Sequence, residues 1–134
     1  MRSRRQHYCH FSSLRQSRGD LDGMPLSVVC GFDPNEMVSF VNENKFIDAK
    51  NVALVGGWDI NEDERKRLGE AGVHVFSIHD VDRLGMVEVM NKAIEVDSNG
   101  TDGIHVSFDV DAITSQEAPA VGTPVHSGLT VRTS

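Results

Sequence analysis

The sequence predicts an α/β fold built on a mostly parallel β-sheet. Two short runs, Asn51–Gly57 and Gly103–Phe108, are apolar almost throughout, as strands buried on both faces are. Segments with helical spacing and helix-end signals alternate with such runs along the chain. A strand–helix–strand–helix–strand order implies parallel strands that are joined by right-handed crossovers.

The first strand and the first helix are delimited by their end residues. Asn51–Gly57 reads NVALVGG, a buried strand that is followed by a glycine turn. Asn61 is a plausible N-cap, and Glu64, three residues later, completes a capping-box pattern. The helix is expected over 62–71, because Gly72 suits the position that follows a helix end.

The second strand is expected over 73–78 and is followed by a helix over 84–96. An apolar stripe at helical spacing supports this helix, formed by Leu84, Val87, Val89, Met90, Ala93 and Ile94. The helix is expected to end near Asn99 and Gly100, before a third strand over 103–108. The apolar run Leu26–Gly31 fits a strand or a helix equally well.

Two features near strand ends allow both a functional and a structural interpretation. His79 and Asp80 form a candidate catalytic pair, but a helix follows the strand directly, which favours Asp80 as a helix cap. Trp58 follows Gly57 at a strand's carboxyl end, where it either lines a pocket or covers an apolar edge.

Charge is distributed unevenly along the chain. Residues 1–18 carry five arginines and no acid, whereas the rest carries 20 acidic residues against eight basic ones. The acidic bulk would repel phosphate, so a nucleic-acid role is not expected. An Arg- and Ser-rich, acid-free N-terminus is similar to a transit peptide, but also to a segment foreign to the domain.

Other properties of the composition indicate all or part of one intracellular domain. No apolar run approaches the roughly 20 residues of a membrane span, so no membrane contact is expected. The two cysteines, Cys9 and Cys30, lie in unlike contexts and do not suggest a disulfide framework. We expect residues 1–18 to be disordered or foreign to the domain, which then covers 19–134.

Asp109 and Asp111 are the strongest candidates for a functional site. If the strand continued through them, both carboxylates would point to the same face and repel each other. A divalent cation between them would relieve that repulsion. The structural alternative is that either aspartate caps a turn or a helix.

Four motifs, in order, resemble those of the ureohydrolases, the family of arginase and agmatinase. Ser107–Asp111 reads SFDVD and leads to Pro119, Gly122-Thr123-Pro124 and Gly128-Leu129-Thr130, like the family's SFDVD, P-x-x-G-T-P and G-G-L-T. The other three are Gly23–Leu26, like H-G-M-P-L; Val81–Gly85, like V-D-R-L-G; and Asp59–Glu64, like D-V-D-P-x-E. The resemblance covers about residues 19–134, the middle of an arginase.

This resemblance implies a portion of the three-layer α/β/α arginase fold, with a site at the carboxyl ends of the strands. It also implies two manganese ions and a bridging hydroxide that attacks a guanidinium carbon and releases urea. Asp109 and Asp111 match two metal-ligating aspartates. His7 matches a metal-ligating histidine when residues are counted back from Gly23 without gaps, although a coincidence of spacing in an unrelated segment is the favoured explanation.

Several positions depart from the family pattern. Asp22 stands where the family has its proton-shuttle histidine, and Asn61 stands where it has a substrate-contacting aspartate. Thr114-Ser115 replaces the D-P that follows the metal aspartates. These departures leave Asp22 as a candidate catalytic residue and Asn61 as a candidate substrate contact.

The sequence therefore supports two functional hypotheses. The first is an arginase-like fragment from a lineage of manganese-dependent hydrolysis of arginine or a related linear amidine, with V-D-R-L-G favouring arginine. The second is an inactive paralogue that acts through binding or subunit assembly, including a possible homo-oligomer. The expected compartment is the cytoplasm, or the mitochondrion if the N-terminus is a transit peptide.

The resemblance also has a structural consequence. Because the chain resembles only part of the family domain, its sheet should leave at least one apolar edge uncovered.

Overall fold

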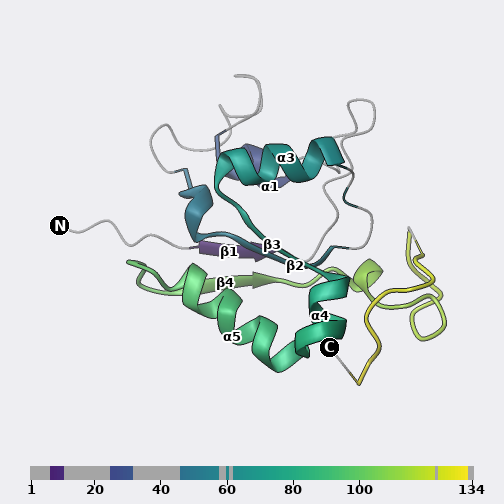
Figure 1. Cartoon of the computed structure of the whole chain (residues 1–134). Helices are drawn as coiled ribbons and strands as arrows, with labels where there is room; N and C mark the ends of the chain where they lie inside the picture. Colours follow the sequence, from purple (N-terminus) through teal and green to yellow (C-terminus); the bar gives the residue numbers. More distant parts are fainter. Residues whose placement is uncertain are drawn as a thin grey trace.

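The structure is a computed structural model that describes residues 7–10, 25–31, 46–57, 60, 62–122 and 124–132. The described strands are β1 (His7–His10), β2 (Ala53–Gly57), β3 (His74–Ser77) and β4 (Ile104–Ser107). They form a parallel sheet in the order β3-β2-β1-β4 (Figure 1). The predicted parallel sheet is therefore confirmed.

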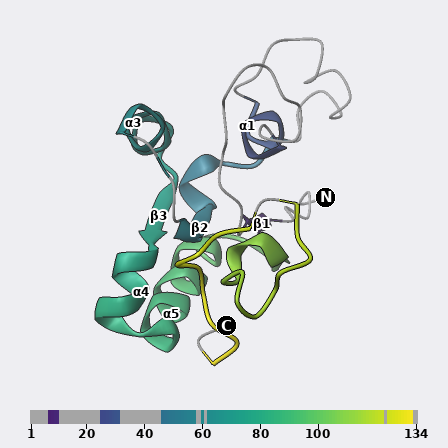
Figure 2. The ribbon, with the colours of Figure 1, turned by 90° about the vertical axis from the view of Figure 1, so that its right-hand side faces the viewer.

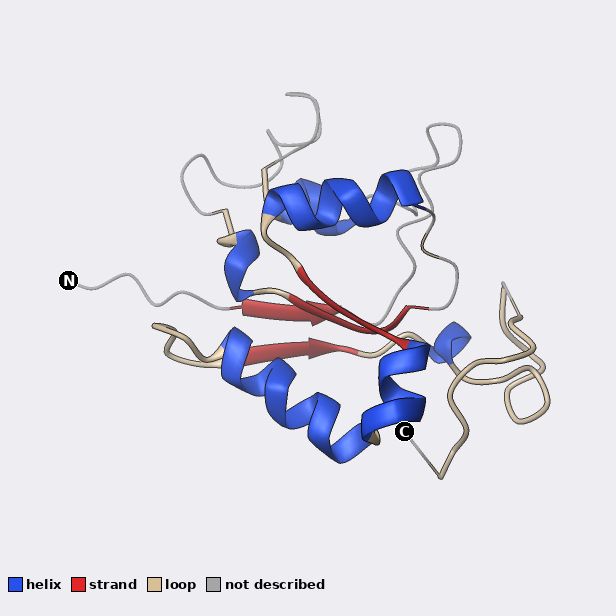
Figure 3. Ribbon diagram, viewed as in Figure 1, coloured by secondary structure: helices blue, strands red, loops and turns tan. Residues whose placement is uncertain are grey.

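Helices cover both faces of this sheet. Helices α1 (Pro25–Val29) and α3 (Glu62–Ala71) lie on one face, and α4 (Ile78–Leu84) and α5 (Met86–Asp97) lie on the other (Figures 1 and 3). A view turned by 90° shows the same separation (Figure 2). Two 3₁₀ turns, η2 (Ala49–Asn51) and η3 (Val110–Ala112), precede β2 and follow β4. The predicted three-layer α/β/α arrangement is confirmed.

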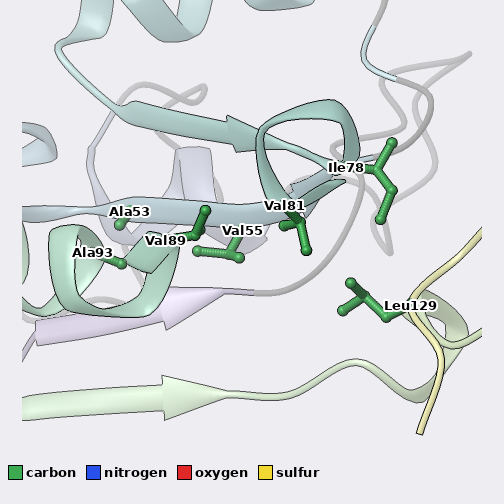
Figure 4. Close-up of a cluster of buried hydrophobic side chains, with 7 residues drawn as sticks. All are labelled: Ala53, Val55, Ile78, Val81, Val89, Ala93 and Leu129. Carbon is green, nitrogen blue, oxygen red and sulfur yellow. The ribbon is translucent and has the colours of Figure 1, made fainter. Parts of the chain in front are cut away.

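Strand β2 is the centre of two apolar clusters because its side chains alternate between the faces. On the α4–α5 side, one cluster is formed by Ala53, Val55, Ile78, Val81, Val89, Ala93 and Leu129 (Figure 4). On the α1–α3 side, the other is formed by Leu26, Ile47, Ala49, Val52, Leu54, Leu68 and Val73. Each fully buried Val or Leu stabilises the fold by roughly 1.5–3 kcal/mol relative to an exposed one.

Both predicted helices are confirmed, and one further helix was missed. Helix α3 has the bounds predicted for it, and Gly72 after it has a φ of 91°. The helix expected over 84–96 is α5, which begins at Met86 and ends at Asp97. The missed helix is α4, which α5 follows after Gly85, whose φ of 83° is a left-handed conformation that glycine adopts without strain.

Strand β1 lies between β2 and β4, so the strand expected over 103–108 does not pair directly with the strand expected over 51–57. Its four residues belong to the basic segment 1–18, yet they pair with β4 over their whole length. The boundary placed after residue 18 stays a prediction. The run Leu26–Gly31, which fitted two structures, forms helix α1 and the turn after it.

None of the described helices has the length and apolar character that a membrane crossing requires.

Candidate metal site after strand β4

The candidate site begins where β4 ends. The strand stops at Ser107, two residues before Asp109, and η3 begins at Val110. Asp109 is the N-cap of η3, and its Oδ1 accepts the main-chain N–H of Asp111 at 2.9 Å. The expectation that an extended strand points the carboxylates of Asp109 and Asp111 to the same face was therefore wrong, because the Asp109 carboxylate turns the chain by binding the N–H two residues ahead.

The turn leaves both carboxylates only half-buried. An ionised carboxylate has about four lone-pair positions, and the hydrogen bond from the Asp111 N–H uses one of those of Asp109. Asp111 lies beside the returning loop, because a Cβ placed on Gly122 would be 4.0 Å from its Oδ2. The structure thus keeps the two aspartates within one short turn at the carboxyl end of a parallel strand.

The loop after η3 returns to the turn and is fixed by main-chain hydrogen bonds. Leu129 N–H donates to the carbonyl of Ala112 at 2.8 Å, and Thr114 N–H donates to the carbonyl of Leu129 at 2.8 Å. Ser115 N–H donates to the carbonyl of Val125 at 2.7 Å. The Leu129 side chain is 2% exposed and packs in the α4–α5 cluster (Figure 4). The turn that carries the aspartates is thereby tied to the core.

Gly128 allows this close return. A Cβ at Gly128 would be 2.5 Å from the carbonyl oxygen of Ala112 and 2.8 Å from Cγ2 of Val125. No side chain fits at those distances, so the loop approaches the turn only because residue 128 is glycine.

A polar contact in this loop was missed from the sequence. Ser115 Oγ lies 3.2 Å from Nδ1 of His126, and Thr114 Oγ1 donates to the carbonyl of His126 at 3.1 Å. Thr114 and Ser115 replace the family's D-P, and Ser127, next to His126, replaces the first glycine of G-G-L-T. The contact depends on the return of the loop, so no local sequence signal indicates it.

The structure describes only some of the other predicted site residues. Asp22 and Asn61 lie outside the described residues, as does Trp58. His7 pairs with Ile104 at the start of β4, whereas His10 pairs with Ser107 at its end. Three residues of extended chain span about 10 Å, so the main chain brings His10, rather than His7, level with the end of β4. The assignment of His7 as a ligand stays a prediction.

The fit of this site to manganese is partial. Carboxylate oxygens suit a hard cation, and Asp109 and Asp111 supply two such groups. Hard cations need about six donors, and the part of the chain that the structure describes holds no group of three or more His, Cys, Asp or Glu placed to bind a metal. The described residues alone do not complete a two-metal site.

Two other titratable groups have shifted pKa values with structural causes. Burial, and then the nearby Asp48 carboxylate, raise the pKa of the Cys30 thiol to about 11, so it is protonated near neutrality. Asp80 Oδ2 accepts from Ser77 Oγ at 2.7 Å and Ser77 N–H at 2.9 Å, which lowers the pKa of Asp80. The prediction that Asp80 caps a helix is confirmed in part: Ser77 is the N-cap of α4, and Asp80, three residues later, completes its capping box by accepting the Ser77 N–H.

Comparison with known proteins shows where this architecture occurs. The family model described as "Arginase family" matches residues 6–134. Arginase from Brevibacillus brevis is 37% identical over 114 residues, which are 85% of this chain and 38% of that protein. Arginase from Bacillus caldovelox is 39% identical over 116 residues, which are 87% of this chain and 39% of that protein.

Solved structures show the same similarity. The native Bacillus caldovelox arginase superposes with a TM-score of 0.85 at 34% identity, covering 96% of this chain and 45% of that one. Entamoeba histolytica arginase in complex with L-ornithine gives 0.83 at 27% identity, covering 96% and 45%. The chain therefore spans less than half the length of each of these relatives.

Proposed function

Because the chain belongs to the arginase family, we propose that it provides part of a site for manganese-dependent hydrolysis of arginine or a related linear amidine to urea. The observation that carries this proposal is the position of Asp109 and Asp111 in one turn at the carboxyl end of a parallel strand. Ligands of open α/β sheets bind at that end.

The chemistry that manganese supplies when bound is a lower pKa for a coordinated water, which generates a nucleophile near neutral pH. In this chain, the carboxylate groups of Asp109 and Asp111 would hold the metal. Further donors have to come from outside the described residues, so we assign no reaction step to the described part alone.

Arginine is the substrate that the comparisons favour. The curated relatives are arginases, and one structural neighbour was solved with L-ornithine, an amino acid with a basic side chain. In this chain, the arginase-like V-D-R-L-G motif forms the end of α4 and its junction with α5. Val81 is buried in the core, and Arg83 Nη2 lies 3.1 Å from Asp80 Oδ1, so these two residues have structural roles here.

The second candidate function is an inactive arginase-like protein that acts through binding or subunit assembly. The specific observation in its favour is that one Asp109 oxygen is already engaged by the main chain of Asp111. Asp22 in place of a histidine also removes a group whose ordinary pKa lies near neutrality. A homo-oligomer and the cytoplasmic or mitochondrial compartment stay predictions.

A manganese titration by calorimetry tests the proposal. We expect binding in the micromolar to millimolar range that is lost in Asp109→Asn and in Asp111→Asn. Asparagine keeps the capping oxygen, so the first variant removes charge without removing the turn. Asp102→Asn is the matched control, because Asp102 is an exposed carboxylate that precedes the same strand.

Urea release from arginine and from agmatine is measured on the same samples. We expect none above background with manganese present, because two carboxylates fall short of a complete ligand set. Manganese-dependent turnover that both variants abolish would contradict that expectation and favour the enzyme over the inactive paralogue. Manganese binding that neither variant weakens would overturn the proposed site.

A further inference from the structure

We propose that Ser115 and His126 form a second reactive site, in which the imidazole activates the hydroxyl to cleave short-chain acyl esters. This "Ser115–His126 pair" consists of those two side chains alone. Both residues lie in the loop after η3, outside the turn that carries Asp109 and Asp111. The proposal therefore depends on no metal and goes beyond the function proposed above.

The contact between the two side chains is the first observation. Ser115 Oγ lies 3.2 Å from Nδ1 of His126, a distance at which a catalytic base takes a proton from a hydroxyl. When the imidazole carries its proton on Nε2, Nδ1 accepts the hydrogen bond that the serine hydroxyl donates. The family's D-P motif has a proline, which has no hydroxyl, at the position of Ser115, so the family pattern does not supply this pair.

Hydrogen bonds to the main chain hold both members of the pair in place. Ser115 N–H donates to the carbonyl of Val125 at 2.7 Å, one residue before His126. The buried Thr114 donates from Oγ1 to the carbonyl of His126 at 3.1 Å. The folded loop thus positions the two side chains before a substrate binds, and such positioning is what allows a base and a nucleophile to act together.

The turn around Ser115 supplies a donor for the negative charge that the reaction develops. Glu117 N–H donates to the carbonyl of Thr114 at 2.9 Å and closes a tight turn. Ser115 and Gln116 are the two central residues of that turn, and the N–H of Gln116 takes no part in the closing bond. In hydrolases with a serine on a sharp turn, the N–H of the residue after the nucleophile forms part of the oxyanion hole.

The reaction that these groups support is acyl transfer to the serine, followed by hydrolysis. Ser115 Oγ attacks the acyl carbon while its proton passes to Nδ1 of His126. The bond between the acyl carbon and the alcohol oxygen then breaks, and the leaving oxygen takes the proton from the imidazole. Water attacks the acyl-serine and gives a proton to the same nitrogen. That proton returns to Ser115 Oγ as the carboxylic acid leaves.

The surroundings of the Ser115–His126 pair indicate the class of substrate. His126 is exposed and Ser115 is half-buried, so the site is open to solvent and suits a small acyl group. Glu117 lies two residues after the serine, and the whole chain carries a net charge of −7, so an anionic ester would be repelled. A neutral ester with a short acyl chain and a good leaving alcohol fits both features.

Hydrolysis of para-nitrophenyl acetate in buffer that contains a metal chelator tests the proposal. We expect the chain to release nitrophenol faster than free imidazole does at the same concentration. Mass spectrometry of the acid-quenched protein should locate an acetyl group on Ser115. An acetyl group found on lysine or histidine side chains but not on Ser115 would overturn the proposal, whatever the variants show.

Variants of the two residues provide the second comparison. Ser115→Ala should abolish both the acetyl group at this position and the rate above background, and His126→Gln should lower that rate by roughly tenfold or more. Ser127→Ala and His74→Gln are the matched controls, because they alter an exposed serine and an exposed histidine outside the pair, and both should keep the full rate. Acetylation of Ser115 at an equal rate in His126→Gln would overturn the proposal, since the serine would then react without its base.

Discussion

The carboxylate of Asp109 binds the main-chain N–H of Asp111 at 2.9 Å, so the first of the two candidate metal ligands fixes the position of the second. This contact ends the extended chain after β4 and starts η3. One side chain therefore serves both the local fold and the candidate site.

Substitution of Asp109 should separate these two roles. Asp109→Ala removes the capping oxygen and should lower the free energy of unfolding by about 1 kcal/mol, the usual cost of losing a cap. Asp109→Asn keeps an oxygen at the same place and should cost only a few tenths of a kcal/mol. Urea unfolding of both variants measures the difference, and equal losses would show that the cap does not stabilise the turn.

Gly128→Ala should destabilise the loop that returns to the site. Its Cβ would be 2.5 Å from the Ala112 oxygen, and forcing such an overlap costs about 1–3 kcal/mol. Gly122→Ala is the control, because its Cβ would be 4.0 Å from its nearest neighbour, Asp111 Oδ2. Thermal unfolding should show a clear loss for the first variant and little change for the second. A Gly128→Ala protein as stable as the unaltered chain would contradict this packing.

Asp80 should make the stability depend on pH in the acid range. Its pKa in the folded chain lies below the ordinary value of 3.8, chiefly because Ser77 Oγ donates to the carboxylate. The stabilisation is therefore complete above pH 3.8 and is lost as the pH falls through the lowered pKa.

Asp80→Asn should consequently be less stable than the unaltered chain at pH 7, with a difference that shrinks below pH 4. Urea unfolding from pH 3 to pH 7 measures this difference. Asp82→Asn, an exposed position on the same helix, is the control and should leave the profile unchanged. A difference that stays constant down to pH 3 would refute the pKa shift.

Cys30 should be a poor nucleophile at neutral pH. Burial and Asp48 raise the pKa of its thiol to about 11, and only the thiolate reacts with disulfide reagents. In a Cys9→Ser background, labelling should be slow at pH 7 and should accelerate with each pH unit until the pH approaches 11. Rapid labelling at pH 7 would show that the thiol is less buried than the structure indicates.

Local sequence signals predicted much of the framework. The apolar run at β2 and the helix-ending Gly72 are features of neighbouring residues, and the structure confirms both elements. Strand β1 could not be predicted in this way, because its sequence, HYCH, has no apolar pattern and its place depends on pairing with strands far along the chain.

The candidate site was predictable in composition but not in geometry. The sequence identified Asp109 and Asp111 as candidate ligands. It also allowed that one of them caps a turn, and Asp109 does so in the structure. The chain after an aspartate either stays extended or turns because the carboxylate binds the N–H two residues ahead. These two arrangements compete locally, and the sequence does not show which is the more stable. The contact between Ser115 and His126 depends on the loop's return and has no local signature.

The most direct test of the proposed site is the electron paramagnetic resonance signal of free manganese(II), recorded as the chain is added. We predict that the unaltered chain reduces the free signal with an affinity between micromolar and millimolar. A chain carrying both Asp109→Asn and Asp111→Asn should leave the free signal unchanged at the same concentrations. Equal depletion by both proteins would contradict the account, because it would place the bound manganese elsewhere than at the turn after β4.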